Sequence, residues 1–131
     1  MGNLDAEEKF FEAVEAFKPV DEKARAGSLK DIDARAFRSV MIDLDAAIPG
    51  LIDENLGRAK LLKAACCHWL YLNNLALKAK SIVFVRDAAP DPLRHEGLSY
   101  ALEGRKVLEE CGGSANDLKW ANDTIRKLSD E

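Results

Sequence analysis

The chain has 131 residues, 47% of them hydrophobic, and a formal net charge of -4. This length suits one compact domain over residues 1–131, and no segment has the low hydrophobicity and high net charge of a disordered region. The longest uncharged apolar run, residues 64–72, is far shorter than the roughly 20 residues that cross a bilayer, and the acidic start lacks a secretory signal pattern. We therefore expect a soluble, cytoplasmic protein without membrane contact, and the acidic balance argues against nucleic-acid binding.

The cysteines agree with an intracellular protein. Cys66, Cys67 and Cys111 are an odd and sparse set in a chain long enough to fold without covalent staples. We expect all three to be reduced thiols.

Apolar residues recur with helical spacing along almost the whole chain. A first helix is expected to begin at Asp5, which with Glu8 makes a capping-box-like start, and to close at Pro19. A second amphipathic helix is expected to begin at Ser28 and to end before Pro49.

A third helical pattern begins at Leu51, and between Leu61 and Leu72 both of its faces are mostly apolar. A helix that is apolar nearly all round is usually central and buried. The asparagine pair at 73 and 74 either breaks this helix or is passed through. Residues 75–85 then continue it or form a further helix, because no second strand is in sight to pair with a strand there.

Asp91 is a suitable cap and Pro92 suits the first helical position, so the next helix is expected to run from Pro92 to Glu110 or Cys111. Gly97 and Gly104 share one face of it. Each glycine costs roughly 1 kcal/mol against alanine in a helix, which predicts that another helix approaches closely along that face.

Gly112 and Gly113 end that helix, and Ser114 with Asp117 starts a last amphipathic helix. The chain therefore reads as five or six helices with short connections. The predicted fold class is all-α, a compact bundle of amphipathic helices that can be arranged as helical hairpins.

Residues 59–92 resemble one tetratricopeptide repeat over about 34 residues. They have a small residue midway along the first half, an alanine at Ala79 and a proline after the second half, but lack several of the usual large aromatics. No second copy follows at that period. The resemblance implies a helical array as the alternative to a closed bundle and identifies no binding residues.

The segment "AACCHWLYL" is the most unusual one in the chain. Neighbours on a helix point about 100° apart, so Cys66 and Cys67 do not easily hold one metal ion, and we predict neither a metal site nor a cofactor. Cys66 lies on the apolar stripe and is expected to face the core. Cys67, within two turns of Lys60 and Lys63, is either a reactive thiol or a small buried hydrophobe.

Residues 56–86 form a basic island without a single acid, made of Arg58, Lys60, Lys63, Lys78, Lys80 and Arg86. If one helix runs through the asparagine pair, five side chains of this segment form a strip within about 40° of one line along the helix. We call it the basic strip, and it consists of Lys60, Cys67, Tyr71, Asn74 and Lys78, with Lys63 beside it. It can bind an acidic peptide or a phosphate group, or its lysines can pair with the acidic first and second helices.

Trp120 lies one position off the stripe of the last helix, at the boundary between core and solvent. A boundary tryptophan either covers the core or anchors a partner, since such residues are frequent hot spots of interfaces.

The sequence contains no phosphate-binding loop, nucleophile elbow or di-iron motif. We therefore expect a non-enzymatic adaptor, inhibitor or assembly module that binds another protein or itself. The alternative is a binder of, or an enzyme for, a small anionic ligand in a pocket lined by Lys60, Lys63 and Tyr71. A third hypothesis is a redox or phosphate relay through Cys67 or His68.

Overall fold

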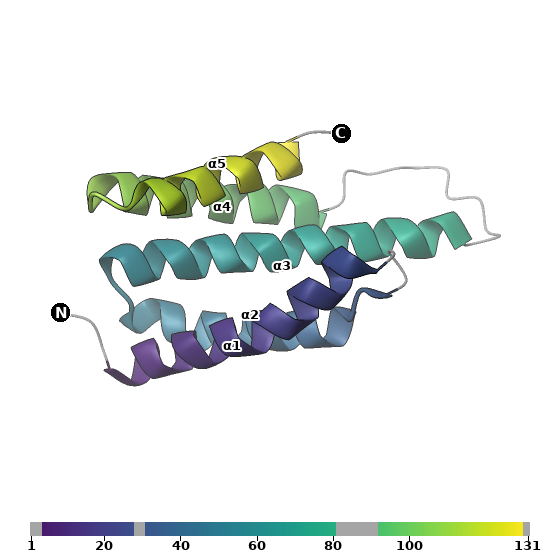
Figure 1. The fold of residues 1–131 in the computed structure, drawn as a ribbon, viewed down its shortest axis with the longest axis horizontal. Coiled ribbons are helices and arrows are strands. Elements are labelled where there is room, and N and C mark those ends of the chain that lie inside the picture. Colours follow the sequence, from purple (N-terminus) through teal and green to yellow (C-terminus); the bar gives the residue numbers. More distant parts are fainter. Residues whose placement is uncertain (1–3, 28–30, 81–91, 130–131) are drawn as a thin grey trace.

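The structure is a computed structural model that describes residues 4–27, 31–80 and 92–129, with only the backbone described for 76–80 (Figure 1). Five α-helices follow one another: α1 (Leu4–Ala26), α2 (Ala34–Ala47), α3 (Asp53–Lys80), α4 (Pro92–Glu110) and α5 (Ala115–Ser129). A short 3₁₀ turn, η2 (Ile48–Gly50), joins α2 to α3. These residues include no strand, and the predicted all-α bundle is confirmed.

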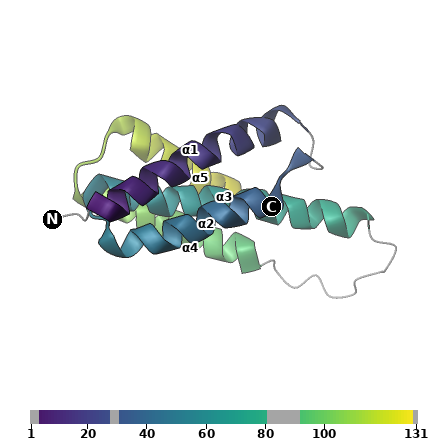
Figure 2. The same cartoon turned by 90° about the horizontal axis from the view of Figure 1, so that it is seen from below.

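The longest helix, α3, lies in the middle of the bundle (Figures 1 and 2). The pair α1 and α2 packs on one side of it, and the pair α4 and α5 packs on the other. Consecutive helices run in alternating directions, so each pair is an antiparallel hairpin.

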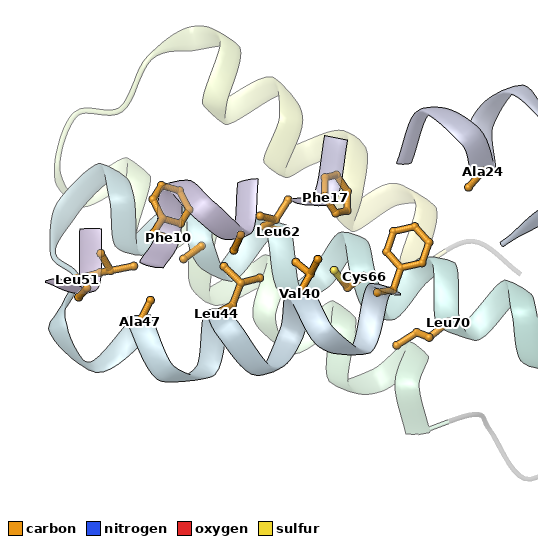
Figure 3. Close-up of a cluster of buried hydrophobic side chains, with 14 of the residues drawn as sticks. Phe10, Phe17, Ala24, Val40, Leu44, Ala47, Leu51, Leu62, Cys66 and Leu70 are labelled. Carbon is orange, nitrogen blue, oxygen red and sulfur yellow. The ribbon is translucent and has the colours of Figure 1, made fainter. Parts of the chain in front are cut away.

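Two groups of buried apolar side chains meet on opposite faces of α3. Ala59, Leu62 and Cys66 face the first group, which contains Phe10 and Phe17 of α1 and Phe37 of α2 (Figure 3). Leu61 and Ala64 face the second group, between α4 and α5. The apolar character of α3 on both faces follows from this position, and the prediction that this helix is central and buried is confirmed.

The predicted end of the first helix at Pro19 is wrong, because α1 continues through it to Ala26. A proline inside a helix costs about 3 kcal/mol, so contacts beyond it must compensate. Ala24 is buried and Val20 packs against the same core. The indole Nε1 of Trp69 also donates a hydrogen bond of 2.9 Å to Asp21, which holds the last turns of α1 against α3.

The second helix begins later than predicted. Asp33 is its N-cap, and the Asp33 carboxylate accepts a hydrogen bond of 3.0 Å from the amide of Ala36. Ser28, the predicted cap, lies outside the described residues. Asp33 satisfies a free amide of the first turn, which is the role that the sequence analysis gave to Ser28.

Helix α3 passes through the asparagine pair at 73 and 74 as a single helix to Lys80. Residues 59–80, which carry most of the resemblance to a tetratricopeptide repeat, therefore lie in one helix. Residues 81–85 and the predicted cap Asp91 are outside the described residues. None of the helices in the described ranges combines the length and the hydropathy that a membrane-spanning segment needs.

The start of α4 at Pro92 and its end at Glu110 agree with the prediction. The turn that follows has Gly112 at φ 72°, a left-handed conformation that favours glycine. The amide of Asp117 donates to the hydroxyl of Ser114 at 3.1 Å, as expected of a helix cap.

The predicted close approach of a helix to the glycine face of α4 is confirmed. A Cβ atom added to Gly104 would lie 2.9 Å from the backbone oxygen of Gly57 in α3, and one added to Gly97 would lie 2.8 Å from Cβ of Cys67. Gly57 is the partner that the sequence analysis did not identify. The backbones of α3 and α4 thus touch where glycine faces glycine.

Candidate functional site

The basic strip does not form one continuous exposed surface among the described residues. Lys60 pairs with Glu103 of α4 at 3.4 Å, while Lys63 and Cys67 are buried. Tyr71 and Asn74 are partly buried, and only the backbone of Lys78 is described. The first half of the strip is therefore a contact within the molecule.

Lys63 is the buried member with a charge, and its side chain is only 5% exposed. Its ammonium pairs with Asp45 of α2 and lies 3.8 Å from the ring centroid of Tyr100 in α4. Burial by itself lowers the pKa of Lys63, but the hydrogen bonds to Asp45 and Tyr100 outweigh burial and raise the pKa above its usual value. Lys63 is thus a protonated link between α2 and α4.

Cys66 and Cys67 are both fully buried. Burial, with smaller contributions from nearby charges, raises the pKa of Cys67 to about 12, and the pKa of Cys66 is raised further. A thiol must ionise to act as a nucleophile or a metal ligand. This environment favours the packing role for both residues, and no three metal-ligating side chains gather in the described part of the chain.

We predict that Cys111, which is partly exposed, reacts first with a maleimide added to the native protein. Cys66 and Cys67 should react at least roughly 100-fold more slowly than Cys111, because only a transient opening of the bundle exposes them. Mass spectrometry of the labelled peptides assigns the sites. Fast labelling in a Cys111→Ser variant would contradict the packing that we describe.

Trp120 is partly buried and packs against both apolar groups, so it covers the core. It also lines a narrow crevice together with Trp69, which stacks on Phe37 with ring centroids 6.1 Å apart.

Two large apolar side chains are exposed and lie together on the outer face of α1. Leu4 is 80% exposed and Phe11 is 53% exposed, and their spacing of seven residues places them on one line of the helix. Phe10, by contrast, faces the core. Phe11 was not identified from the sequence, although an aromatic residue beside the apolar stripe is a visible signal.

Four carboxylates surround these two side chains, and with them they line a shallow hollow of about 580 Å³: Glu7, Glu8, Glu12 and Glu15. We call these six residues the acidic-apolar face. Its only recorded ion pair is at one end, where Lys18 lies 3.3 Å from Glu15 among the described residues. The face is open to solvent, so it suits contact with a macromolecular surface better than enclosure of a small ligand.

Other large exposed apolar side chains lie on different elements, as in Ile42 of α2, which is 68% exposed, and Leu102 of α4. Single exposed apolar residues are normal on any protein surface and need no explanation. The combination of two such residues with four like charges on one helix face is what distinguishes α1.

No family model matches the chain, and neither a curated protein nor a solved structure is significantly similar to it. The arguments about function therefore depend on the residues and contacts described above.

Proposed function

We propose that this protein is a cytoplasmic, non-enzymatic interaction module that binds a basic amphipathic helix on the acidic-apolar face of α1. The observation that carries the proposal is the pairing of exposed Leu4 and Phe11 with four surrounding carboxylates. Apolar contacts provide most of the affinity of such interfaces, and complementary charges select the partner.

Charge decides between the possible occupants of this face. Two copies of the chain meeting face to face would bring eight glutamates together, which opposes symmetric self-association. Nucleic acids and anionic lipid surfaces are repelled for the same reason. A helix with an apolar stripe flanked by lysine or arginine is complementary both to the side chains and to the charge of the face.

The test is a titration with a synthetic amphipathic peptide of leucine and lysine, followed by fluorescence anisotropy and by backbone amide NMR shifts. We expect shifts confined to residues 4–15 and saturable binding. A Phe11→Ser variant should bind about tenfold more weakly or worse, because an interface aromatic commonly contributes more than 1 kcal/mol.

Two matched controls separate a specific site from general attraction to an acidic protein. Ile42→Ser removes an apolar side chain of α2 that is more exposed than Phe11, and it should leave the affinity unchanged. Glu8→Gln with Glu12→Gln should weaken binding more than Asp43→Asn with Glu110→Gln, although both pairs change the net charge equally. Equal losses in the two pairs, or shifts scattered over all acidic regions, would contradict the proposal.

A further inference from the structure

A narrow crevice lies between α1 and α5, and its floor is formed by α3. Both outer helices pack against α3, but in the described residues their backbones do not pack against each other. Ala65 and Trp69 of α3 line the crevice together with Trp120 of α5. The crevice has a volume of about 30 Å³, enough for one or two waters or for part of a larger group at its mouth.

Three basic side chains from three helices line this crevice: Arg25 of α1, His68 of α3 and Lys127 of α5. None of them belongs to the basic strip. We call the space that they share the His68 crevice. It combines a planar guanidinium, an imidazole and an ammonium around one small volume.

Asp21, the acid that lines the crevice, is occupied by contacts with its neighbours. Its Oδ1 accepts the hydrogen bond from Trp69 Nε1 at 2.9 Å, and its Oδ2 accepts one from Arg25 Nε at 2.8 Å. Asp21 therefore orients Arg25 and uses only the Nε of its guanidinium. Within residues 4–27, 31–80 and 92–129, the terminal nitrogens of Arg25 and the ammonium of Lys127 have no recorded partner.

His68 is partly buried, and we find no hydrogen-bond partner for its ring nitrogens in the described part of the chain. Burial and the positive charges of Lys127 and Arg25 lower the pKa of His68. The charged groups that face the crevice are Asp21 and Arg25 from α1 and Lys127 from α5. The two cations therefore act on the imidazole in the same direction as burial, and both effects disfavour its protonated form.

We propose that the His68 crevice binds a phosphate group, either inorganic phosphate or the phosphate of a small monoester. The terminal nitrogens of a guanidinium match two oxygens of a tetrahedral oxyanion, and the ammonium adds a further charge-assisted contact. The imidazole can donate to a third oxygen. The small volume admits only part of the phosphate head, so the remaining oxygens and the rest of a monoester lie outside the crevice.

The chain supplies its own reference for a test, because its second histidine, His95, is exposed and lies outside the crevice. The Cε1 proton of each histidine is followed by NMR while inorganic phosphate is added at constant ionic strength. We expect a saturable shift of the His68 signal, an increase in the His68 pKa with phosphate, and no saturable change at His95.

Lys127→Gln should weaken phosphate binding about tenfold or more, as expected when a charge-assisted contact is lost. Lys119→Gln is the matched control, because it removes the same charge from another exposed position of α5. Both substitutions are on the surface, so the fold should persist in each variant. Circular dichroism of each variant checks that the helical fold is retained.

Three outcomes would overturn the proposal: equal, unsaturable shifts at both histidines, equal effects of the two lysine substitutions, or equal binding of chloride and acetate. A parallel titration with glycerol 3-phosphate distinguishes the two sources of the group. Saturation by both ligands supports a site for phosphate monoesters, whereas saturation by inorganic phosphate alone supports a site for the free ion.

Discussion

Replacing Phe37 by alanine is expected to lower the free energy of unfolding by about 3–5 kcal/mol, the range for deleting a buried aromatic side chain. Phe37 is completely buried where α1, α2 and α3 meet. Its ring makes an edge contact with Phe17 and a stacked contact with Trp69, and such pairs contribute beyond the apolar area that they bury. The cavity left by the substitution would lie between three helices that cannot all move inward.

Chemical denaturation followed by circular dichroism measures this loss. The control is Phe11→Ala, because Phe11 is half-exposed on the outer face of α1. This substitution should lower the free energy of unfolding by less than about 1 kcal/mol. Similar losses for the two variants would show that α2 does not pack as described.

Replacing Gly104 by alanine is expected to lower the free energy of unfolding by about 2–3 kcal/mol. Alanine favours a helix over glycine by roughly 1 kcal/mol, so helix propensity alone predicts the opposite sign. The added methyl group would lie 2.9 Å from the backbone oxygen of Gly57 and 3.1 Å from Leu61. A backbone oxygen cannot rotate away, so α3 and α4 would have to separate.

The sign of the change is the decisive result. Ser99→Ala, at an exposed position of α4, gives the effect of adding alanine without a helix contact and should change stability by less than about 0.5 kcal/mol. If Gly104→Ala stabilised the protein as helix propensity predicts, the close crossing of α3 and α4 would be wrong.

Sequence patterns were sufficient for the features that depend on local spacing. The fold class, the central position of α3 and the close approach at Gly104 all follow from helical periodicity or from an otherwise costly glycine. The end predicted at Pro19 was wrong because a contact between Asp21 and Trp69, far apart in the sequence, holds the helix together beyond the proline.

The candidate functional surfaces also divide into those with a local signal in the sequence and those that depend on contacts between distant residues. The charge pattern suggested that Lys63 could face a ligand, but its burial depends on Asp45 and Tyr100, which no local signal connects to it. The acidic-apolar face could have been found by following Phe11 along its helix. The His68 crevice could not, because Arg25, His68 and Lys127 come together only through the packing of three helices.

The position of α3 between two apolar groups also decides how the molecule comes apart. Removal of α4 and α5 would leave Leu61 and Ala64 facing water, and removal of α1 and α2 would do the same to Leu62 and Cys66. A single hairpin together with α3 would therefore expose an apolar face of α3, so it is not an autonomous folding unit. The shared helix makes cooperativity a property of the whole bundle, so loosening of one hairpin lowers the stability of the other through α3.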